Sequence, residues 1–375
     1  MIRSFLIAVI ASLTLAVPAS AAGPLPTTPP QIGHVFVIVL ENENADVTFG
    51  AGSPAPYLSQ TLPRQGAFIP EYYGITHLSL GNYIGLVSGQ GANPQTQADC
   101  QIFTDFAFVT FGLDGQALGQ GCVYPAAVKT VADQLTARGL TWKGYMEDMG
   151  NDTTREATLC GHPGINTRDN TQNAAADDQY ATRHNPFVYF HSIIDDHVSC
   201  EQRDVPLTQL PNDLVKARTT PNLSFITPNL CHDGHDEPCA NQEPGGLVSA
   251  DAFLREWVPR ITNSQAFKKD GLLLVTFDEA EADPQHPEEA DASACCNQAQ
   301  FPNTPNNGGP IPGMGGGRVG AVALSPFIRP GTVTSHPYNH FSTLRTIEGL
   351  FGLPYLGYAA SPDPGKFGSD VFSAP

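Results

Sequence analysis

Runs of apolar residues along the chain predict the strands of a β-sheet. They occupy residues 34–40, 141–145, 223–227, 272–277 and 319–324. Continuous rather than alternating apolar runs are typical of parallel strands that are buried on both faces. We therefore expect these runs to form the centre of a sheet.

Amphipathic stretches predict helices that lie between the strands in the sequence. They cover residues 79–88, 128–138, 250–261 and 341–351, and Gly352 is expected to end the last one. Because strands and helices alternate, we expect an α/β protein with a mainly parallel central sheet that helices cover on both sides.

Two long stretches interrupt this alternation. Residues 151–180 are polar and rich in Asn, Asp and Thr, and residues 280–317 are rich in Pro, Gly, Asn and Ala. Strand patterns resume after each stretch, so we interpret both as surface insertions in a single domain over residues 22–375. Loops of this length often cover functional sites.

The beginning of the chain has the pattern of a secretory signal peptide. Arg3 precedes an apolar stretch over residues 5–17, and small residues follow at 19–21. The apolar stretch is shorter than the roughly 20 residues of a membrane-spanning helix. Cleavage after Ala21 is therefore favoured over an uncleaved anchor. We expect a secreted protein, extracellular or periplasmic, with no stable membrane anchor.

The 8 cysteines agree with export, because disulfides persist in oxidising compartments. The alternative, a zinc–thiolate site, is disfavoured because the sequence has no CxxC pair. Neighbours in the sequence suggest three pairs and leave the adjacent Cys295 and Cys296: Cys100–Cys122, Cys160–Cys200 and Cys231–Cys239.

The net charge of -18 limits the classes of partner. Nucleic acids and anionic membrane surfaces both require a basic face, so we expect no nucleic-acid partner. An anionic substrate is still allowed, because a bound cation can dominate the local field.

Three of the apolar runs end in acidic, amide or imidazole side chains. Glu41 and Asn42 follow the first run, Asp278 and Glu279 follow residues 272–277, and a His- and Asp-rich segment, 232–236, follows residues 223–227. Open α/β sheets bind ligands beyond the carboxyl ends of their strands. A single pair of this kind could be a helix cap or a solvated turn, but the repetition favours a shared site.

A divalent cation is the natural partner of buried carboxylates that would otherwise repel each other. Oxygen-rich ligands suit Mg, Ca or Mn better than a thiol-seeking metal, and the sequence does not choose among the three. The predicted ligands are Glu41, Asn42, Ser79, Asp278 and Glu279.

Ser79 is the candidate nucleophile. It lies in the segment THLSLGNYIGLVSG, at the predicted start of a buried helix, where a helix N-terminus favours an anion. Serine is a weak nucleophile unless a base or a metal activates it. A plain helix cap is the structural alternative for Ser79, and it is compatible with catalysis. A metal-independent serine esterase is disfavoured, because the chain has no GxSxG motif.

Imidazole and guanidinium groups could complete the site. An imidazole can donate a proton to a leaving oxygen, hold a phosphate oxygen or bind a second metal, although a single histidine is more often structural. We expect His235 and His340 to act in catalysis, and the remaining candidates from this class are His77, His184, Arg183 and Arg318.

Seven segments together resemble the phosphoesterase family of secreted acid phosphatases and bacterial phospholipases C, within the alkaline-phosphatase-like superfamily. The segments run in order from residue 34 to residue 353: HVFVIVLEN, THLSLGNYIGLVSG, TWKGYMEDM, HNPFVYF, FITPNLCHDGHD, LLLVTFDEA and ALSPFIRPG with NHFSTLRTIEGLFGL. The resemblance implies a three-layer α/β/α sandwich and hydrolysis through a phosphoserine at Ser79.

The resemblance also assigns site residues. It implies that the predicted metal ligands form one cluster and that Asp233, with the three histidines His184, His235 and His340, surrounds the phosphate or a second metal. The Ser79 segment is similar to that of nucleotide pyrophosphatases, in which an Asn follows the hydroxyl residue by three positions, as Asn82 does here. The expected phosphate contacts are Asn42, His77, Asn82, His184 and Asp233.

The expected function is that of a secreted acid phosphatase acting on small phosphate monoesters, with a phospholipid headgroup as a further substrate class. No basic or aromatic membrane-binding patch stands out in the sequence, and this favours soluble monoesters. The alternatives are a phospholipase C or other phosphodiesterase on the same site, and a non-catalytic secreted metal- or ligand-binding protein. We expect a monomer.

Overall fold

The computed structural model describes residues 31–283 and 285–372. The predicted signal peptide, residues 1–21, lies outside the described residues. Among the residues that are described, no helix is long and apolar enough to cross a bilayer.

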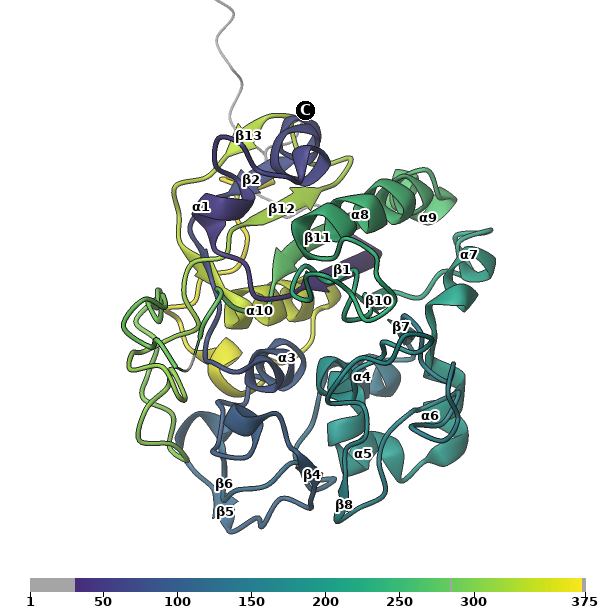
Figure 1. Ribbon diagram of the computed structural model, residues 1–375. Helices are drawn as coiled ribbons and strands as arrows, with labels where there is room; N and C mark the ends of the chain where they lie inside the picture. Colours follow the sequence, from purple (N-terminus) through teal and green to yellow (C-terminus); the bar gives the residue numbers. More distant parts are fainter. Residues whose placement is uncertain (1–30, 284, 373–375) are drawn as a thin grey trace, which may run out of the picture.

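An eight-stranded sheet forms the centre of the molecule (Figure 1). Five neighbouring strands, in the spatial order β11-β1-β10-β7-β9, are parallel, and only β12 runs against its neighbours. The mainly parallel sheet is thus confirmed. The strands, in the order β13-β2-β12-β11-β1-β10-β7-β9, are Thr332–Val333, Ala67–Ile69, Ala321–Leu324, Gly271–Phe277, His34–Leu40, Leu223–Thr227, Trp142–Met146 and Asp204–Pro206.

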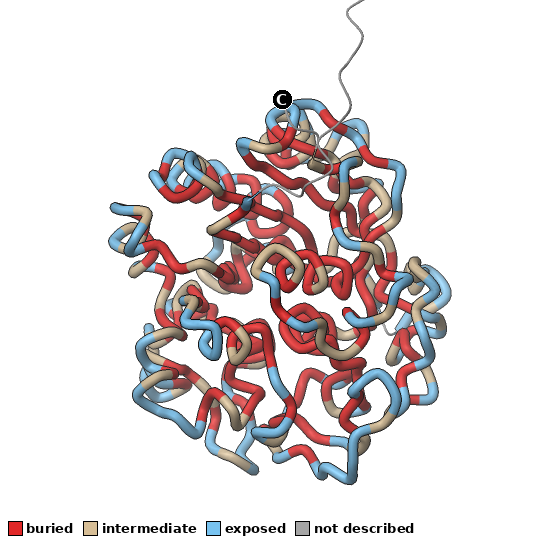
Figure 2. Tube along the Cα trace, turned by 180° about the vertical axis from the view of Figure 1, so that it is seen from behind, coloured by how far each residue is buried: buried red, intermediate tan, exposed pale blue. Residues whose placement is uncertain are grey.

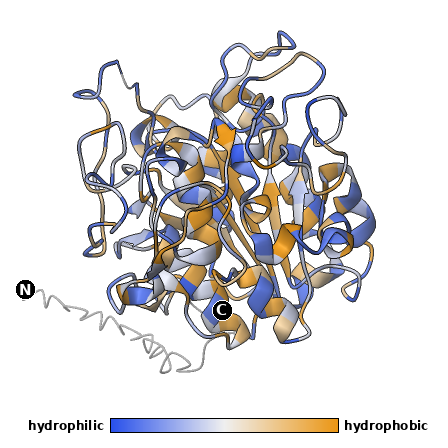
Figure 3. Cartoon of the chain, turned by 90° about the horizontal axis from the view of Figure 1, so that it is seen from below, coloured by the Kyte–Doolittle hydropathy of each residue, from blue (hydrophilic) through white to orange (hydrophobic). Residues whose placement is uncertain are grey.

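Helices cover both sides of this sheet (Figures 1 and 3). On one side, α3 (Ser79–Ser88) packs against α10 (His340–Phe351) and α4 (Val131–Ala137). On the other side lie α8 (Gly246–Thr262) and α9 (Gln265–Asp270). The three-layer architecture is therefore as predicted. Gly352 ends α10 in a left-handed conformation, φ 63°, which glycine adopts without strain.

Shorter elements complete the described chain. The helices are α1 (Ala45–Thr48), α2 (Leu62–Gln65), α5 (His191–Ile194), α6 (His197–Arg203) and α7 (Leu210–Asp213). The strand pairs outside the main sheet are β3 (Tyr72–Tyr73) with β14 (Tyr338–Asn339), β4 (Ile102–Phe103) with β8 (Thr167–Arg168), and β5 (Thr110–Phe111) with β6 (Ala117–Leu118).

The central strands are buried along their whole length, and exposed residues gather in the loops (Figure 2). β1 pairs with β11 over all seven of its residues and with β10 on its other edge. Because these three strands are parallel and in contact, their carboxyl ends lie side by side. This arrangement brings together the polar residues that follow them.

Four disulfides are present among the described residues, and one of them ties a loop to Cys200 in α6. The three predicted pairs, Cys100–Cys122, Cys160–Cys200 and Cys231–Cys239, are confirmed. The remaining pair, Cys295–Cys296, joins adjacent residues within the insertion at 280–317. Between β11 and β12 the described residues of this insertion form no helix or strand, and residues 151–180 contain only β8.

Candidate active site

Backbone hydrogen bonds fix the strand ends to one another. The N–H of Asp278 donates to the carbonyl of Leu40 at 2.9 Å, and the N–H of Glu41 donates to the carbonyl of Asp233 at 2.8 Å. The segments after β1, β10 and β11 therefore meet at one edge of the sheet, as the sequence predicts. Glu41, Asp233 and Asp278 are all buried there.

Glu41, His184 and Asp233 form the tightest group of metal-ligand side chains at this edge. One ligand atom of each lies within 4.8 Å of the others. Nε2 of His184 contacts Oε1 of Glu41, and Nδ1 of His184 lies 3.7 Å from Oδ2 of Asp233. His184 and Asp233, which we expected to contact a phosphate, are thus placed beside Glu41 as a possible second set of metal ligands.

Asp278 and Asn42 lie beside this group. Oδ1 of Asp278 accepts hydrogen bonds from the N–H of Asn42 at 3.2 Å and from the N–H of Glu279 at 2.6 Å. Asn42 has φ 54°, a left-handed conformation in which Asn is several-fold enriched. This backbone conformation lets one residue place both its N–H and its side chain at the strand end.

Several buried oxygens at the site have no hydrogen-bond partner among the described residues. They are Oε2 of Glu41, Oδ1 of Asn42, Oδ2 of Asp233 and Oδ2 of Asp278. Buried acceptors without partners are costly. A bound divalent cation would satisfy them, and the carboxylate and amide oxygens with the imidazole of His184 form a donor set that fits such a cation.

The buried acids also repel one another. Burial raises the pKa of Asp278 well above its usual range, and the charges of Glu41 and Glu279 raise it further. Burial and the charge of Glu41 do the same to the pKa of Asp233. Burial lowers the pKa of His184, which favours the neutral imidazole that a metal ligand requires. A cation would offset the repulsion among the carboxylates.

Ser79 is the first residue of α3 and is buried. Residues three and four positions further along a helix share its face. On that face, Nδ2 of Asn82 donates to Oε2 of Glu279 at 3.1 Å, and the ring of Tyr83 stacks on His184 with ring centroids 5.2 Å apart. The face of α3 that carries Ser79 thus contacts both the β11 end and the Glu41 group.

The side chain of Asn82 stabilises the loop before α3. Its Oδ1 accepts hydrogen bonds from the N–H groups of Ile75 and Thr76, and its Nδ2 also donates to the carbonyl of Thr76. These contacts use the amide on protein groups, so a phosphate contact by Asn82, as expected from the sequence, would require it to leave them.

Two predicted histidines contact protein groups through both ring nitrogens. His77 lies 3.2 Å from Oε2 of Glu279 through Nδ1 and 3.1 Å from the carbonyl of Asp291 through Nε2. His340, the first residue of α10, contacts the hydroxyl of Tyr72 and the carbonyl of Asp278. Burial lowers the pKa of each ring to about 4. The proton-donor role expected for His340 would require the ring to leave both contacts.

His235 differs from these rings, because its side chain is exposed. Its N–H donates to Oδ1 of Asp233 at 3.0 Å, and its Nδ1 lies 3.1 Å from Oδ1 of Asp236. The hydrogen bond with Asp236 raises the pKa of His235 to about 9, and the charges of Glu41 and Asp233 act in the same direction. His235 is thus an exposed, protonated imidazole two residues from a candidate metal ligand.

The two candidate arginines are placed differently. Arg183 is buried; its Nη1 donates to the carbonyl of Gln172 at 3.1 Å and its Nε lies 4.0 Å from Oδ2 of Asp99. Arg318 forms an ion pair with the exposed Asp46, at 2.6 Å. The geometry therefore keeps Arg183 and not Arg318 as a candidate for contact with an anion.

Asp99 and Tyr83 were missed in the sequence. Oδ1 of Asp99 accepts a hydrogen bond from the N–H of Leu80, the second residue of α3, and burial raises the pKa of Asp99 to about 6. The hydroxyl of Tyr83 is buried without a partner among the described residues. The helical spacing from Ser79 could have identified Tyr83, whereas no sequence pattern connects Asp99 to the start of α3.

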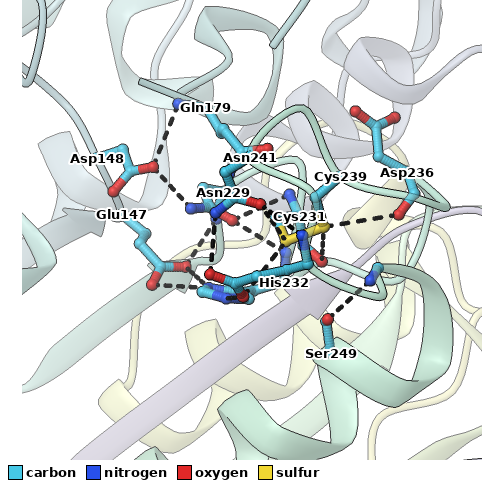
Figure 4. Close-up of polar contacts among 12 residues, drawn as sticks. Glu147, Asp148, Gln179, Asn229, Cys231, His232, Asp236, Cys239, Asn241 and Ser249 are labelled. Atoms are coloured by element: carbon cyan, nitrogen blue, oxygen red, sulfur yellow. Dashed lines mark hydrogen bonds and ion pairs between the residues drawn. A yellow bond between two sulfur atoms is a disulfide. The ribbon is translucent and has the colours of Figure 1, made fainter. Parts of the chain in front are cut away.

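A network at the end of β7 holds the loop that carries Asp233 and His235 (Figure 4). Oε2 of Glu147 accepts the N–H of Asn229, and both carboxylate oxygens of Glu147 lie 3.0 Å from Nδ1 of His232. Oδ1 of Asn229 in turn accepts the N–H groups of Cys231 and His232. With the Cys231–Cys239 disulfide, these contacts set the position of Asp233.

Comparison with known proteins identifies the family of this chain. Residues 51–354 match the Phosphoesterase family. An acid phosphatase of Aspergillus fumigatus is 25% identical over 296 residues, which are 79% of this chain and 51% of that protein. The chain thus spans about half the length of that relative.

Two further similarities concern a shorter relative and a solved structure. A phosphatidylinositol-3-phosphatase of Mycobacterium tuberculosis is 25% identical over 344 residues, 92% of this chain and 84% of that protein. The crystal structure of a protein in the alkaline phosphatase superfamily from Vibrio parahaemolyticus has a TM-score of 0.50 and 12% identity, covering 91% of this chain and 71% of that one. This last similarity concerns the fold.

Proposed function

The chain belongs to the phosphoesterase family, and we propose that it hydrolyses phosphate monoesters through a covalent phosphoserine on Ser79. One observation carries the proposal. The first residue of a buried helix is a serine, and the helix face that carries it contacts Glu279 and His184, which lie beside buried acids with oxygens that lack partners among the described residues. Phosphoryl transfer needs a nucleophile and positive charge at one place, and this arrangement can supply both.

The proposed metal ligands are Glu41, Asn42, Ser79, Asp278 and Glu279, with His184 and Asp233 around Glu41. A bound Mg, Ca or Mn ion would lower the pKa of the Ser79 hydroxyl and balance the charge of the phosphate. The oxygen-rich ligand set supports a hard cation, and the imidazole of His184 also allows a borderline one.

The chain's own residues then perform the reaction. The Ser79 hydroxyl loses its proton to solvent and its oxygen attacks phosphorus in line with the ester oxygen; the P–O bond to the leaving alcohol breaks, and His235 donates a proton to that alcohol. Because the pKa of His235 is raised to about 9, the donor is protonated at acidic and neutral pH. Arg183 and the N-terminus of α3, apart from the Leu80 N–H that Asp99 accepts, stabilise the phosphate oxygens. Water then attacks phosphorus, gives a proton back to His235 and displaces the Ser79 oxygen, which regains its proton from solvent.

His77, Asn82 and His340 hold the site in this proposal. His77 and Asn82 orient Glu279, and His340 orients the backbone of Asp278. Groups that orient ligands in this way commonly change activity or metal affinity about 10- to 100-fold when they are removed.

A phosphorylated lipid headgroup is the second candidate substrate. The relative named for a phosphoinositide substrate is matched over 84% of its length, whereas the fungal acid phosphatase is matched over 51%. A phosphodiesterase on the same site is the third possibility and is separated by substrate: nitrophenyl phosphate reports the monoesterase, and nitrophenyl phosphorylcholine reports the diesterase.

The deciding experiment measures phosphate release from nitrophenyl phosphate with and without a chelator, beside Ser79→Ala. We expect activity to fall at least ~1000-fold in both cases, because the nucleophile or its activating charge is lost. Ser88→Ala is the matched control: Ser88 is also buried on α3, and its hydroxyl donates to the carbonyl of Ile84 and accepts the N–H of Gln90, at the other end of the helix from Ser79. Activity that survives Ser79→Ala would remove the phosphoserine, and activity that survives chelation would remove the metal.

A further inference from the structure

A β-hairpin far from the strand ends exposes large apolar side chains. β5 and β6 pair antiparallel, with Thr110 opposite Leu118 and Phe111 opposite Ala117. Val109 and Phe111, on its first arm, are 75% and 44% exposed, and Leu113, which begins the 3-10 turn Leu113–Gly115 at its tip, is 88% exposed. Alternate residues of an extended segment point to the same side. The hairpin therefore presents one apolar edge, at the lower end of the molecule in Figure 1.

A disulfide and hydrogen bonds fix the hairpin to the rest of the protein. The Cys100–Cys122 disulfide closes its base, and backbone hydrogen bonds join Phe106 to Val123 and Val109 to Leu118. Gln116 donates to the carbonyl of Gly89 and accepts the N–H of Gly91, which ties the second arm to the end of α3. The exposed edge is thus presented by a fixed support.

The apolar edge continues into a shallow hollow of about 330 Å³. Phe111, Val128, Tyr355 and Leu356 contribute to its lining, and Lys129 is its single basic lining residue. The guanidinium carbon of Arg345 lies over the ring of Tyr355, 4.3 Å from its centroid. An apolar edge beside an aromatic hollow is a larger feature than a single exposed side chain.

Charge and size limit what this surface can bind. No Lys or Arg occurs between residues 101 and 128, the hairpin carries Asp105 and Asp114, and the whole chain has a net charge of -18. An anionic membrane would therefore repel it. Three side chains and a hollow also cover far less than the roughly 800 Å² that each partner buries in a stable protein interface. Insertion at a lipid boundary needs only a few apolar side chains.

We propose that the edge formed by Val109, Phe111 and Leu113 inserts into the surface of a zwitterionic lipid bilayer. The bilayer would then hold the protein near lipid-borne phosphate esters, and only this consequence rests on the proposed function.

The test is co-sedimentation of the secreted protein with phosphatidylcholine vesicles. Val109→Ser combined with Leu113→Ser should lower the bound fraction at least about tenfold, because two apolar side chains no longer leave water. The matched control is Val198→Ser combined with Val215→Ser, since these residues are 66% and 62% exposed on other parts of the surface. The control should bind as the wild type does.

Several results would overturn the inference. They are no binding by the wild type, equal binding by the hairpin variant, and binding that appears only with anionic lipid. A wild-type dimer that the hairpin substitutions convert to a monomer would assign the edge to a second copy of the chain. Hydrolysis of a soluble nitrophenyl ester, measured in parallel, should be the same in all three proteins. Vesicle binding needs no turnover. A wild type that binds the vesicles but does not hydrolyse the soluble ester would therefore contradict the proposed function alone.

Discussion

Two regions of this molecule depart from the usual distribution of residues, and they do so in opposite directions. At the ends of β1, β10 and β11, acids and imidazoles are buried, and several of their oxygens have no hydrogen-bond partner among the described residues. At the tip of the β5–β6 hairpin, large apolar side chains are exposed. Burying an unpaired acid and exposing an apolar edge both cost free energy in water.

Each region lacks a partner of a different kind. The site edge brings together negative charge that a cation would balance, and the hairpin presents apolar area that a lipid boundary would cover. Neither region is completed by neighbouring side chains, although the chain elsewhere places its apolar residues inside, as Figure 2 shows for the central strands. Exceptions of this kind are expected where function and stability conflict.

The largest effect is expected when one negative charge is removed from the buried acids at the strand ends. Asp278→Asn keeps the shape of the side chain and removes its charge. Hydrolysis should fall at least ~1000-fold, because a metal ligand is lost. The melting temperature in chelator should instead rise by a few degrees, because the repulsion from Glu41 and Glu279 that raises the pKa of Asp278 is removed. Phosphate release and thermal unfolding measure the two effects.

Asp204→Asn is the control for that prediction. Asp204 is equally buried, burial raises its pKa to about 7, and it accepts a hydrogen bond from Asn185, away from the strand ends. Above pH 7 this variant should also be more stable than the wild type, with hydrolysis unchanged. Retained hydrolysis in Asp278→Asn would place the metal elsewhere.

The sequence predicted the framework of the site better than its fine structure. The long apolar runs gave β1 and β10 with their exact bounds, and the acids that follow them lie together because parallel strands in contact end at the same edge. The short strands β2, β9 and β13 were missed, since two or three residues are too few for a periodic pattern.

Contacts made through loops could not be predicted. Oδ1 of Asp99 accepts the N–H of Leu80 from a loop in which Asp99 and Cys100 have φ 51° and 48°, and Nε2 of His340 contacts the backbone carbonyl of Asp278. The hairpin was also missed, because its apolar residues are indistinguishable in sequence from residues of a buried strand. Only its position shows that they face solvent.

An intermediate effect is expected at the network that holds Asp233. His232→Gln removes the charge that Glu147 and Glu243 share. We expect hydrolysis to fall about tenfold, as is common when a group that orients a ligand is lost. His232 also predicts a pH dependence. Against the effect of burial, hydrogen bonds with Glu147 and Glu243 raise its pKa to about 9.

A raised pKa in the folded state stabilises the fold below the unfolded value, near 6.5, and this stabilisation is lost as pH rises through about 9. The midpoint of urea unfolding should therefore fall over that window in the wild type and less in His232→Gln. His191→Gln is the control, because His191 is held by Asp105 and Asp195, which also raise its pKa, yet lies away from the strand ends. It should lose the same kind of stability without losing activity; equal losses of activity would contradict a role for His232 in positioning Asp233.

The smallest effect is expected at the exposed hairpin. Leu113→Lys removes one apolar side chain from the hairpin tip and adds one positive charge. Binding to phosphatidylcholine vesicles should fall severalfold, and the ratio of binding to vesicles that contain phosphatidylserine over binding to phosphatidylcholine vesicles should rise about fivefold, the effect of one basic residue near an anionic surface. Leu113 is 88% exposed and supports no core contact, so the free energy of unfolding should change by less than about 0.5 kcal/mol. Val198→Lys adds the same charge away from the hairpin and should leave binding to phosphatidylcholine unchanged. If both lysine variants bind each kind of vesicle equally, the hairpin does not contact the bilayer, and its apolar edge needs another partner.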